Sequence, residues 1–185
     1  CRGSPEQTAA PPEPDTSKLT ELDLNPDSDV PYVPTPPDVV DKMLELAGVT
    51  SADTVFDLGS GDGRIVIRAA EKYGAHGVGI DIDPNRVREA RRNARAAGVS
   101  DLVTFHEGDL FELDLSSATV VTLYLLPELN EKLRPKLFRQ LPAGTPIVSH
   151  SFGMGEWQPE RQVNVDASMV YLWTIPEDPP EYLNE

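Results

Sequence analysis

One short stretch of the sequence combines alternating glycines with aspartates and could bind a small charged ligand. Residues 55–65 run from an apolar segment through three glycines into an amphipathic segment, which is the order of a strand, a tight turn and a helix. Glycine allows positive φ and lets a ligand lie against bare backbone. The free N–H groups of the following helix would face that ligand. The candidate binding residues of this turn are Asp57, Gly59, Ser60, Gly61, Asp62 and Gly63.

A second acidic position follows about 20 residues after the glycines, the separation expected for a carboxylate that accepts hydrogen bonds from a ribose. The apolar run 77–82 contains Asp81 near its end, and Asp83 stands directly before Pro84. We assign Asp83 to the cap of the helix that Pro84 opens, and Asp81 to the ribose. Ile82 joins Asp81 in the candidate set. The alternative is that either acid only caps the helix.

The glycine spacing separates two classes of cofactor. A dinucleotide requires G-x-G-x-x-G, whereas this chain has G-x-G-x-G, with Asp57 before it and Asp62 inside it. These carboxylates would repel a pyrophosphate and would suit a ligand that carries an ammonium and a sulfonium. Residues 57–63 resemble the first motif of class I S-adenosylmethionine (SAM) methyltransferases, which implies SAM as cofactor and S-adenosylhomocysteine as product.

The same resemblance implies a third contact region. Residues 106–110 fall where the third strand of that family ends. Asp109 matches the acid that contacts the adenine amino group, and Gly108 and Leu110 flank it in the expected cofactor site. No metal site is expected, because the only cysteine is Cys1.

Length and composition favour one domain. The 185 residues are enough for one core, and nine of the 18 prolines fall in the first 37 residues. We expect a flexible acidic tether over residues 1–28, a domain over 29–176 and an acidic tail over 177–185. The net charge of −15 lies largely in these two ends. A chain this acidic lacks the excess of basic residues with which proteins bind nucleic acids. We therefore expect no nucleic acid as partner, and a monomer.

The presence of Cys1 at the start of the sequence allows two cellular locations for the protein. A bacterial lipoprotein begins with a lipid-carrying cysteine, and a tether behind it would hold the domain off a membrane. The alternative is that Cys1 is only the point at which the sequence was cut. SAM supply favours the cytoplasm, whereas a lipid on Cys1 favours a membrane-tethered place in the cell envelope. No stretch reaches the roughly 20 apolar residues of a membrane span.

The order of the predicted elements indicates the fold class. Five apolar runs, at 54–58, 77–82, 102–107, 118–124 and 146–151, alternate with helical patterns or turns and predict a parallel, doubly wound α/β sheet. Segments 162–166 and 168–175 predict an antiparallel hairpin at the sheet edge. This ending resembles the Rossmann-like seven-stranded class I methyltransferase sheet. Ligands of such sheets lie beyond the carboxyl ends of the strands.

Helix 84–97 carries five arginines, which allows two interpretations. An arginine-rich helix can bind RNA, but we favour a solvated face that pairs with local acids such as Glu89.

Further motifs narrow the resemblance to the lysine N-methyltransferases that act on the ATP synthase c-subunit and the adenine nucleotide translocase, with their bacterial relatives. The motifs are residues 32–36, 57–66, 123–127 with 132–134, 141–144, 148–149, Trp157 and Pro159. The resemblance implies a protein substrate with an exposed lysine. The alternatives are a small-molecule methyltransferase and a SAM-binding protein without turnover.

Candidate residues for the acceptor side follow from the same motifs. Tyr124 is the catalytic candidate, placed beside the transferring methyl, or else it only packs under the next helix. Tyr32 and Thr35 would form a flap over the cofactor. Phe152 and Trp157 either wall a lysine channel or pack at the edge. The remaining polar candidates are expected to be structural, with His150 a satisfied strand histidine, Thr122 a packing residue and Glu128 a helix cap.

Overall fold

The computed structural model describes residues 33–183. The predicted tether over 1–28, the lipid predicted for Cys1, the flap residue Tyr32 and the last two residues of the predicted tail lie outside the described residues. The division into tether, domain and tail stays a prediction.

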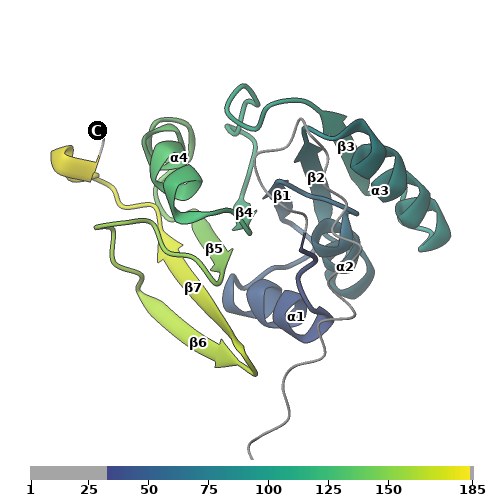
Figure 1. Ribbon diagram of the computed structural model, residues 1–185, viewed down its shortest axis with the longest axis horizontal. Helices are drawn as coiled ribbons and strands as arrows, with labels where there is room; N and C mark the ends of the chain where they lie inside the picture. The colour runs from purple at the N-terminus through teal and green to yellow at the C-terminus, as the bar shows by residue number, and fades with distance from the viewer. Residues whose placement is uncertain (1–32, 184–185) are drawn as a thin grey trace, which may run out of the picture.

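A mixed seven-stranded sheet forms the centre of the fold (Figure 1), in the order β3-β2-β1-β4-β5-β7-β6. The five strands β3, β2, β1, β4 and β5 are parallel, and β7 runs antiparallel between β5 and β6. This arrangement confirms the predicted fold class and the antiparallel hairpin at its edge. The strands are β1 (Thr54–Leu58), β2 (His76–Asp81), β3 (Val103–Glu107), β4 (Val120–Leu123), β5 (Pro146–His150), β6 (Arg161–Val165) and β7 (Ser168–Thr174).

Helices cover both faces of the sheet. The helices are α1 (Pro37–Leu46), α2 (Arg64–Tyr73), α3 (Pro84–Ala96) and α4 (Pro127–Gln140), followed by a 3-10 turn, η2 (Glu181–Leu183). Side chains alternate between the faces of a strand. Val55 of β1 therefore packs in the core under α1, α2 and α3, whereas its neighbour Phe56 packs in the core under α4. Two apolar layers thus hold the parallel strands in place.

Glycine and proline set the helix ends. Gly63 (φ 81°) precedes α2 and Gly74 (φ 69°) ends it, both in the left-handed region that glycine tolerates. Pro84 opens α3, and the Asp83 side chain accepts a 2.8 Å hydrogen bond from the Asn85 N–H. The predicted Asp83 cap is thereby confirmed.

The longest helix, α4, contains a proline. Pro135 lies inside it and removes one backbone N–H from the helical ladder. Leu133 and Leu137 are nevertheless fully buried, and burial of this apolar face stabilises the helix. Among the helices of residues 33–183, none is long and apolar enough to cross a bilayer.

Candidate functional site

The glycine turn joins β1 to α2 at the carboxyl end of the sheet. Gly59, Gly61 and Gly63 all have positive φ, at 86°, 51° and 81°. The N–H groups of Gly59 and Ser60 both donate to the carbonyl of Ile80, at 2.9 and 2.8 Å, which ties the turn to β2. Gly59 is exposed and Ser60 is buried. The turn therefore exposes bare backbone at Gly59 and is held in place by its hydrogen bonds to β2.

Two glycines near the turn are required by the protein's own core. A Cβ on Gly63 would lie 2.6 Å from the Phe105 ring, and a Cβ on Gly79 would lie 2.6 Å from the same ring and 2.7 Å from Ser60 Oγ. Phe105 thus fills the space that side chains there would need. Gly59 differs, because its hypothetical Cβ would meet only the side chain of Leu125, at 3.1 Å.

Asp57 lies beneath the turn and is almost completely buried, with 3% of its surface exposed. Thr122 stands directly opposite it in the β1–β4 ladder, and its hydroxyl donates a 2.8 Å hydrogen bond to Asp57 Oδ1. Burial raises the pKa of Asp57 to about 7, although the Thr122 hydrogen bond lowers it; the charges of Asp81 and Asp62 raise it further. A buried carboxyl with this pKa is ready to ionise when a cation binds nearby.

Asp81 ends β2 and faces the turn. Its Oδ2 accepts a 2.8 Å hydrogen bond from the Gly61 N–H, and its Oδ1 accepts one of 2.9 Å from the Asp83 N–H. Each carboxylate oxygen has a second lone pair, so both can still accept from a ligand hydroxyl. Ile82, beside it, is 54% exposed. A carboxylate next to an exposed apolar surface suits a ribose with its attached base.

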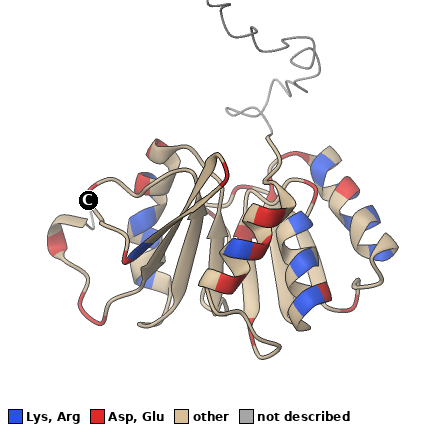
Figure 2. Cartoon of the chain, turned by 90° about the horizontal axis from the view of Figure 1, so that it is seen from below, with Lys and Arg blue, Asp and Glu red and all other residues tan. Residues whose placement is uncertain are grey.

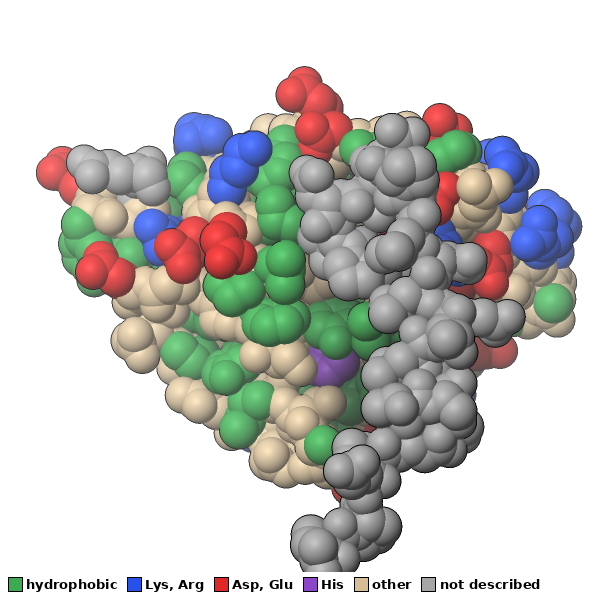
Figure 3. Space-filling view, viewed as in Figure 1, with side chains coloured by type: hydrophobic (Ala, Val, Ile, Leu, Met, Phe, Trp, Pro, Cys, Tyr) green, Lys and Arg blue, Asp and Glu red, His purple; other side chains and the backbone are tan. Residues whose placement is uncertain are grey.

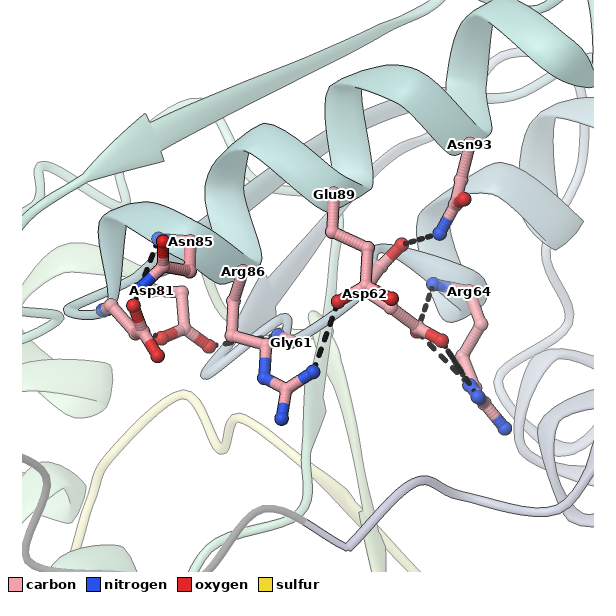
Figure 4. A network of polar contacts seen from close by, with 9 residues as sticks. Gly61, Asp62, Arg64, Asp81, Asn85, Arg86, Glu89 and Asn93 are labelled. Atoms are coloured by element: carbon pink, nitrogen blue, oxygen red, sulfur yellow. Dashed lines mark hydrogen bonds and ion pairs between the residues drawn. The ribbon is translucent and has the colours of Figure 1, made fainter. Parts of the chain in front are cut away.

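Asp62 is bound tightly within the turn (Figure 4). The Arg64 guanidinium donates to both of its carboxylate oxygens, with Nη2 to Oδ2 at 2.6 Å. The Asn93 side chain of α3 donates to the Asp62 carbonyl at 2.9 Å. Asp62 is therefore ion-paired with Arg64, and its carbonyl joins the turn to α3.

The end of β3 lies next to Asp81. The Gly108 N–H donates to the Asp81 carbonyl at 3.0 Å, and Gly108 has φ 156°. Asp109 is exposed, and its Oδ1 accepts a 2.9 Å hydrogen bond from the Phe111 N–H. Leu110 is half-buried. The structure brings all three predicted residues of this segment to the same end of the sheet as the glycine turn.

An aromatic cluster stands at the end of β4 and β5. The Tyr124 ring lies 4.0 Å from the His150 ring and stacks on Phe152 at 6.0 Å with an interplanar angle of 18°. Ser151, between His150 and Phe152 in the sequence, has φ 63°, which is uncommon for a non-glycine residue. The sharp turn at Ser151 directs Phe152 toward Tyr124. Burial raises the pKa of Tyr124. Its phenol therefore remains protonated at neutral pH.

Other predicted residues turn out to be structural. Trp157 packs on Phe138 and Trp173, at 4.7 and 5.9 Å between ring centroids, on the α4 side of the sheet, which agrees with the alternative of edge packing. His150 is buried with both ring nitrogens partnered, as expected of a satisfied strand histidine. The prediction that Glu128 caps α4 was wrong, because that helix has no side-chain cap.

Sequence reasoning missed Asn130. It is fully buried, and its Nδ2 donates to the Leu125 and Gly153 carbonyls, at 3.3 and 3.1 Å. It thereby joins the loops that follow β4 and β5 and positions the aromatic cluster. Its Oδ1 has no hydrogen-bond partner within the described chain. The sequence did contain a signal for this role, because Asn130 is a polar residue on the apolar face of the helical pattern that became α4.

The residues present fit SAM. The acids meet the requirement of a ligand with an ammonium and a sulfonium, Asp81 has acceptor capacity left for ribose hydroxyls, and the exposed Ile82 offers apolar surface for a base. These features lie together at the carboxyl ends of β1 and β2, the usual ligand position in such sheets.

Comparisons with known proteins agree with this fit. The family model described as the ANTKMT methyltransferase domain matches residues 57–161, and that of the histone methylation protein DOT1 matches residues 13–98. A protein-lysine N-methyltransferase of Saccharolobus islandicus (strain REY15A) is 47% identical over 80% of this chain and 95% of that protein. An adenine nucleotide translocase lysine N-methyltransferase of Mus musculus is 34% identical over 79% of this chain, which spans 63% of the mouse protein.

Solved structures extend the agreement to the fold. A crystal structure described as an RNA methyltransferase from Salinibacter ruber, in complex with S-adenosylhomocysteine, is 65% identical, with a TM-score of 0.81 over 83% of this chain and all of the other. A SAM-dependent methyltransferase from Geobacter sulfurreducens, with the same ligand, is 25% identical, with a TM-score of 0.58 over 68% of this chain and 52% of the other. The family model spans more than half of this sequence, so the chain belongs to the ANTKMT methyltransferase domain family, within the class I SAM-dependent methyltransferases.

Proposed function

We propose that this chain transfers the methyl group of SAM to the ε-amino group of a lysine in a protein substrate. The observation that carries the proposal is the aromatic cluster of Tyr124 and Phe152, which follows the carboxyl ends of β4 and β5, at the same end of the sheet as the glycine turn and Asp81. The names of the Saccharolobus and mouse relatives support lysine as the acceptor.

The cofactor would be held by residues of three strand ends. In this proposal the glycine turn holds the amino-acid end of SAM above Asp57, Asp81 holds the ribose, and Asp109 contacts the adenine amino group. Bound SAM supplies a methyl group on a sulfonium, whose departure leaves a neutral thioether. The residues assigned to cofactor binding are Tyr32, Thr35, Asp57, Gly59, Ser60, Gly61, Asp62, Gly63, Asp81, Ile82, Gly108, Asp109 and Leu110.

Tyr124 would act on the acceptor by contact and orientation. A lysine must be neutral to attack, and an apolar pocket lowers its pKa. Because burial raises the pKa of Tyr124, its hydroxyl stays protonated and can hydrogen-bond an amine without acting as a base. The ring faces of Tyr124 and Phe152 can hold the side chain, since cations bind well over aromatic rings.

The surroundings suit a segment that carries aliphatic and basic side chains. Four large hydrophobic side chains are exposed within residues 33–183. Of these, Ile82 directly follows β2, Leu126 lies three residues beyond β4, and Val33 lies two residues before the buried Thr35. On the face shown in Figure 3, hydrophobic side chains gather at the centre, with acidic side chains beside them. Such a surface can dock a lysine-containing peptide.

The test is to incubate the purified chain with methyl-labelled SAM and a cell extract, and to locate the label by mass spectrometry. We expect mono- or polymethylated lysine in protein, absent from reactions with Asp81→Ala. A peptide from the labelled protein should accept methyl groups, and the same peptide with its target lysine changed to arginine should accept none. Label in small molecules alone, or SAM binding without any product, would refute the proposal.

A second candidate, methylation of RNA, is favoured by two observations. The Salinibacter structure is described as an RNA methyltransferase. Helix α3 carries five arginines and one glutamate (Figure 2). Arg91 and Arg95 line an open depression of about 380 Å³ with Ser100, Thr104 and His106. The same labelling experiment decides between the two: label that survives protease and is released by ribonuclease would establish RNA as the acceptor.

A further inference from the structure

Thr35 connects two regions of the site that are far apart in the sequence. Only 4% of its surface is exposed, although Val33, Pro34 and Pro36 around it are exposed. Its Oγ1 is hydrogen-bonded to His150 Nδ1 at 3.1 Å, across 115 positions of sequence. Its carbonyl accepts a 3.0 Å hydrogen bond from Arg64 Nη1. The segment 33–36 is therefore held from two sides at a single residue.

Arg64 carries one of these contacts to the cofactor turn. The guanidinium that binds the Thr35 carbonyl also binds the Asp62 carboxylate through Nε and Nη2. A planar guanidinium that donates to two groups fixes their relative positions. Segment 33–36 and the glycine turn are thus joined through Arg64.

His150 carries the other contact to the acceptor side. Its Nε2 is hydrogen-bonded to Ser168 Oγ of β7 at 3.0 Å, so both ring nitrogens are fixed by hydroxyl groups. Burial lowers the pKa of His150, and the groups that meet its ring are the neutral side chains of Thr35, Ser168 and Tyr124. The imidazole therefore remains neutral and in a fixed orientation, with its ring 4.0 Å from that of Tyr124.

We propose that His150 is a positioning residue with two linked roles. It holds segment 33–36 closed over the cofactor turn, and it aligns the ring of Tyr124. Its Nδ1 anchors Thr35, and its ring supports the Tyr124 ring on the acceptor side. Loss of the Nδ1 contact frees segment 33–36 and weakens SAM binding, whereas loss of the ring disturbs Tyr124. This inference rests on the proposed function, which supplies both the cofactor and the acceptor.

Two amide variants of His150 separate its two nitrogens. The amide of asparagine occupies roughly the place of Nδ1, and that of glutamine roughly the place of Nε2. His150→Asn therefore keeps the partner on Thr35, and His150→Gln keeps the partner on Ser168. For the Thr35 side of the same contact, the matched pair is Thr35→Val, which removes the hydroxyl, and Thr35→Ser, which retains it. Ser168→Ala serves as the control for the Nε2 contact.

Calorimetric titration with SAM is the first measurement. We expect His150→Gln and Thr35→Val each to raise the dissociation constant about fivefold, the equivalent of one net hydrogen bond. His150→Asn, Thr35→Ser and Ser168→Ala should stay within about twofold, and the double variant Thr35→Val/His150→Gln should bind no worse than either single variant, because both remove the same contact. Additive losses, or unchanged binding by Thr35→Val, would overturn the proposal.

Hydrogen exchange of the unliganded chain tests the anchor without any cofactor. The amides of Val33, Thr35 and residues 38–40 should exchange faster in His150→Gln and Thr35→Val than in the unaltered chain, and His150→Asn should retain protection. Equal protection in all variants would refute the anchor, even if SAM binds. Faster exchange in a chain that binds no SAM would instead leave the anchor standing and remove the proposed function.

The second role of His150 is read from steady-state kinetics. His150→Gln and His150→Asn both lose the ring against Tyr124, so both should lower kcat, whereas Thr35→Val should raise KM for SAM with kcat nearly unchanged. A kcat of either amide variant equal to that of the unaltered chain would contradict the support of Tyr124.

Discussion

Asp57 on β1 and Thr122 on β4 are opposite partners in the sheet, and the threonine hydroxyl donates a 2.8 Å hydrogen bond to the buried carboxyl group. The pKa of Asp57 is raised to about 7, chiefly by burial. A hydroxyl supplies no positive charge, so this pair leaves the aspartate only partly ionised at neutral pH. A bound cation would favour the ionised form.

Asp57 should make the unliganded chain less stable as pH rises. Its pKa is about 7 in the folded chain and 3.8 as a free side chain, so between these values the folded state binds more protons than the unfolded state. The free energy of unfolding therefore falls with rising pH through this window, and the loss is complete above about pH 7. At pH 8, Asp57→Asn should be more stable than the unaltered chain, by up to about 4 kcal/mol. Urea unfolding at pH 5 and 8 measures this, and parallel pH profiles would contradict it.

The same substitution should weaken cofactor binding. The unaltered chain should bind SAM more tightly as pH rises through about 7, because the ionised Asp57 attracts a cationic ligand. Asp57→Asn should bind more weakly at pH 8 and show little pH dependence in this range. Calorimetric titrations at several pH values provide the measurement, with Thr122→Ser as a control that retains the hydroxyl.

Asp81 should contribute more to SAM affinity than the neighbouring Asp83. Asp81→Ala removes a carboxylate that would accept charge-assisted hydrogen bonds from the ribose, so we expect a loss of about 10- to 100-fold. Asp83→Asn preserves the cap of α3, because asparagine caps helices about as well as aspartate. Titration of both variants is decisive, since similar losses would mean that the effect comes from disturbance of the loop.

Tyr124 should respond differently to loss of its hydroxyl and loss of its ring. Tyr124→Phe keeps the stack on Phe152 and the contact with His150, so kcat should fall by no more than about tenfold, the scale of one hydrogen bond. Tyr124→Ala opens the aromatic cluster and should reduce kcat much further. Neither change should alter SAM affinity by more than a few fold. Equal kcat for the phenylalanine and alanine variants would place Tyr124 outside the acceptor site.

Gly79 should be intolerant of even a methyl group. Its Cβ would lie 2.6 Å from the Phe105 ring, and overpacking of this kind costs about 1–3 kcal/mol. Gly79→Ala should lower the free energy of unfolding by that amount, and the additional change Phe105→Leu should restore part of it. Gly153→Ala is the matched control, because nothing lies within 4 Å of its hypothetical Cβ.

The fold could be predicted because the five parallel strands are short apolar runs that alternate with helical patterns or turns, and because βαβ connections have a fixed hand. The two extended segments 162–166 and 168–175, with no helix between them, likewise indicated a hairpin. The full extent of α4 was harder to predict, since Pro135 interrupts a pattern that burial of Leu133 and Leu137 nevertheless stabilises. Local periodicity carries no information about such tertiary compensation.

The site was predictable where it is local and not where it depends on long-range contacts. The spacing of the glycines and Asp81 follows from a single βαβ unit. The contact of Thr35 with His150 joins positions 115 residues apart, and the pairing of Asp57 with Thr122 joins positions 65 apart. The packing of Trp157 against Trp173 depends on where β7 inserts, which the order of the segments does not specify.

The position of β7 bears on how the chain is made. Because synthesis runs from the N-terminus, the five parallel strands emerge first, and the outer edge of β5 stays unpaired until residues 168–174 have left the ribosome. Ser168, which fixes His150, arrives with that same strand. An unpaired strand edge invites association with other chains. Newly made chains should therefore depend most on chaperones in the short interval between completion of β5 and insertion of β7.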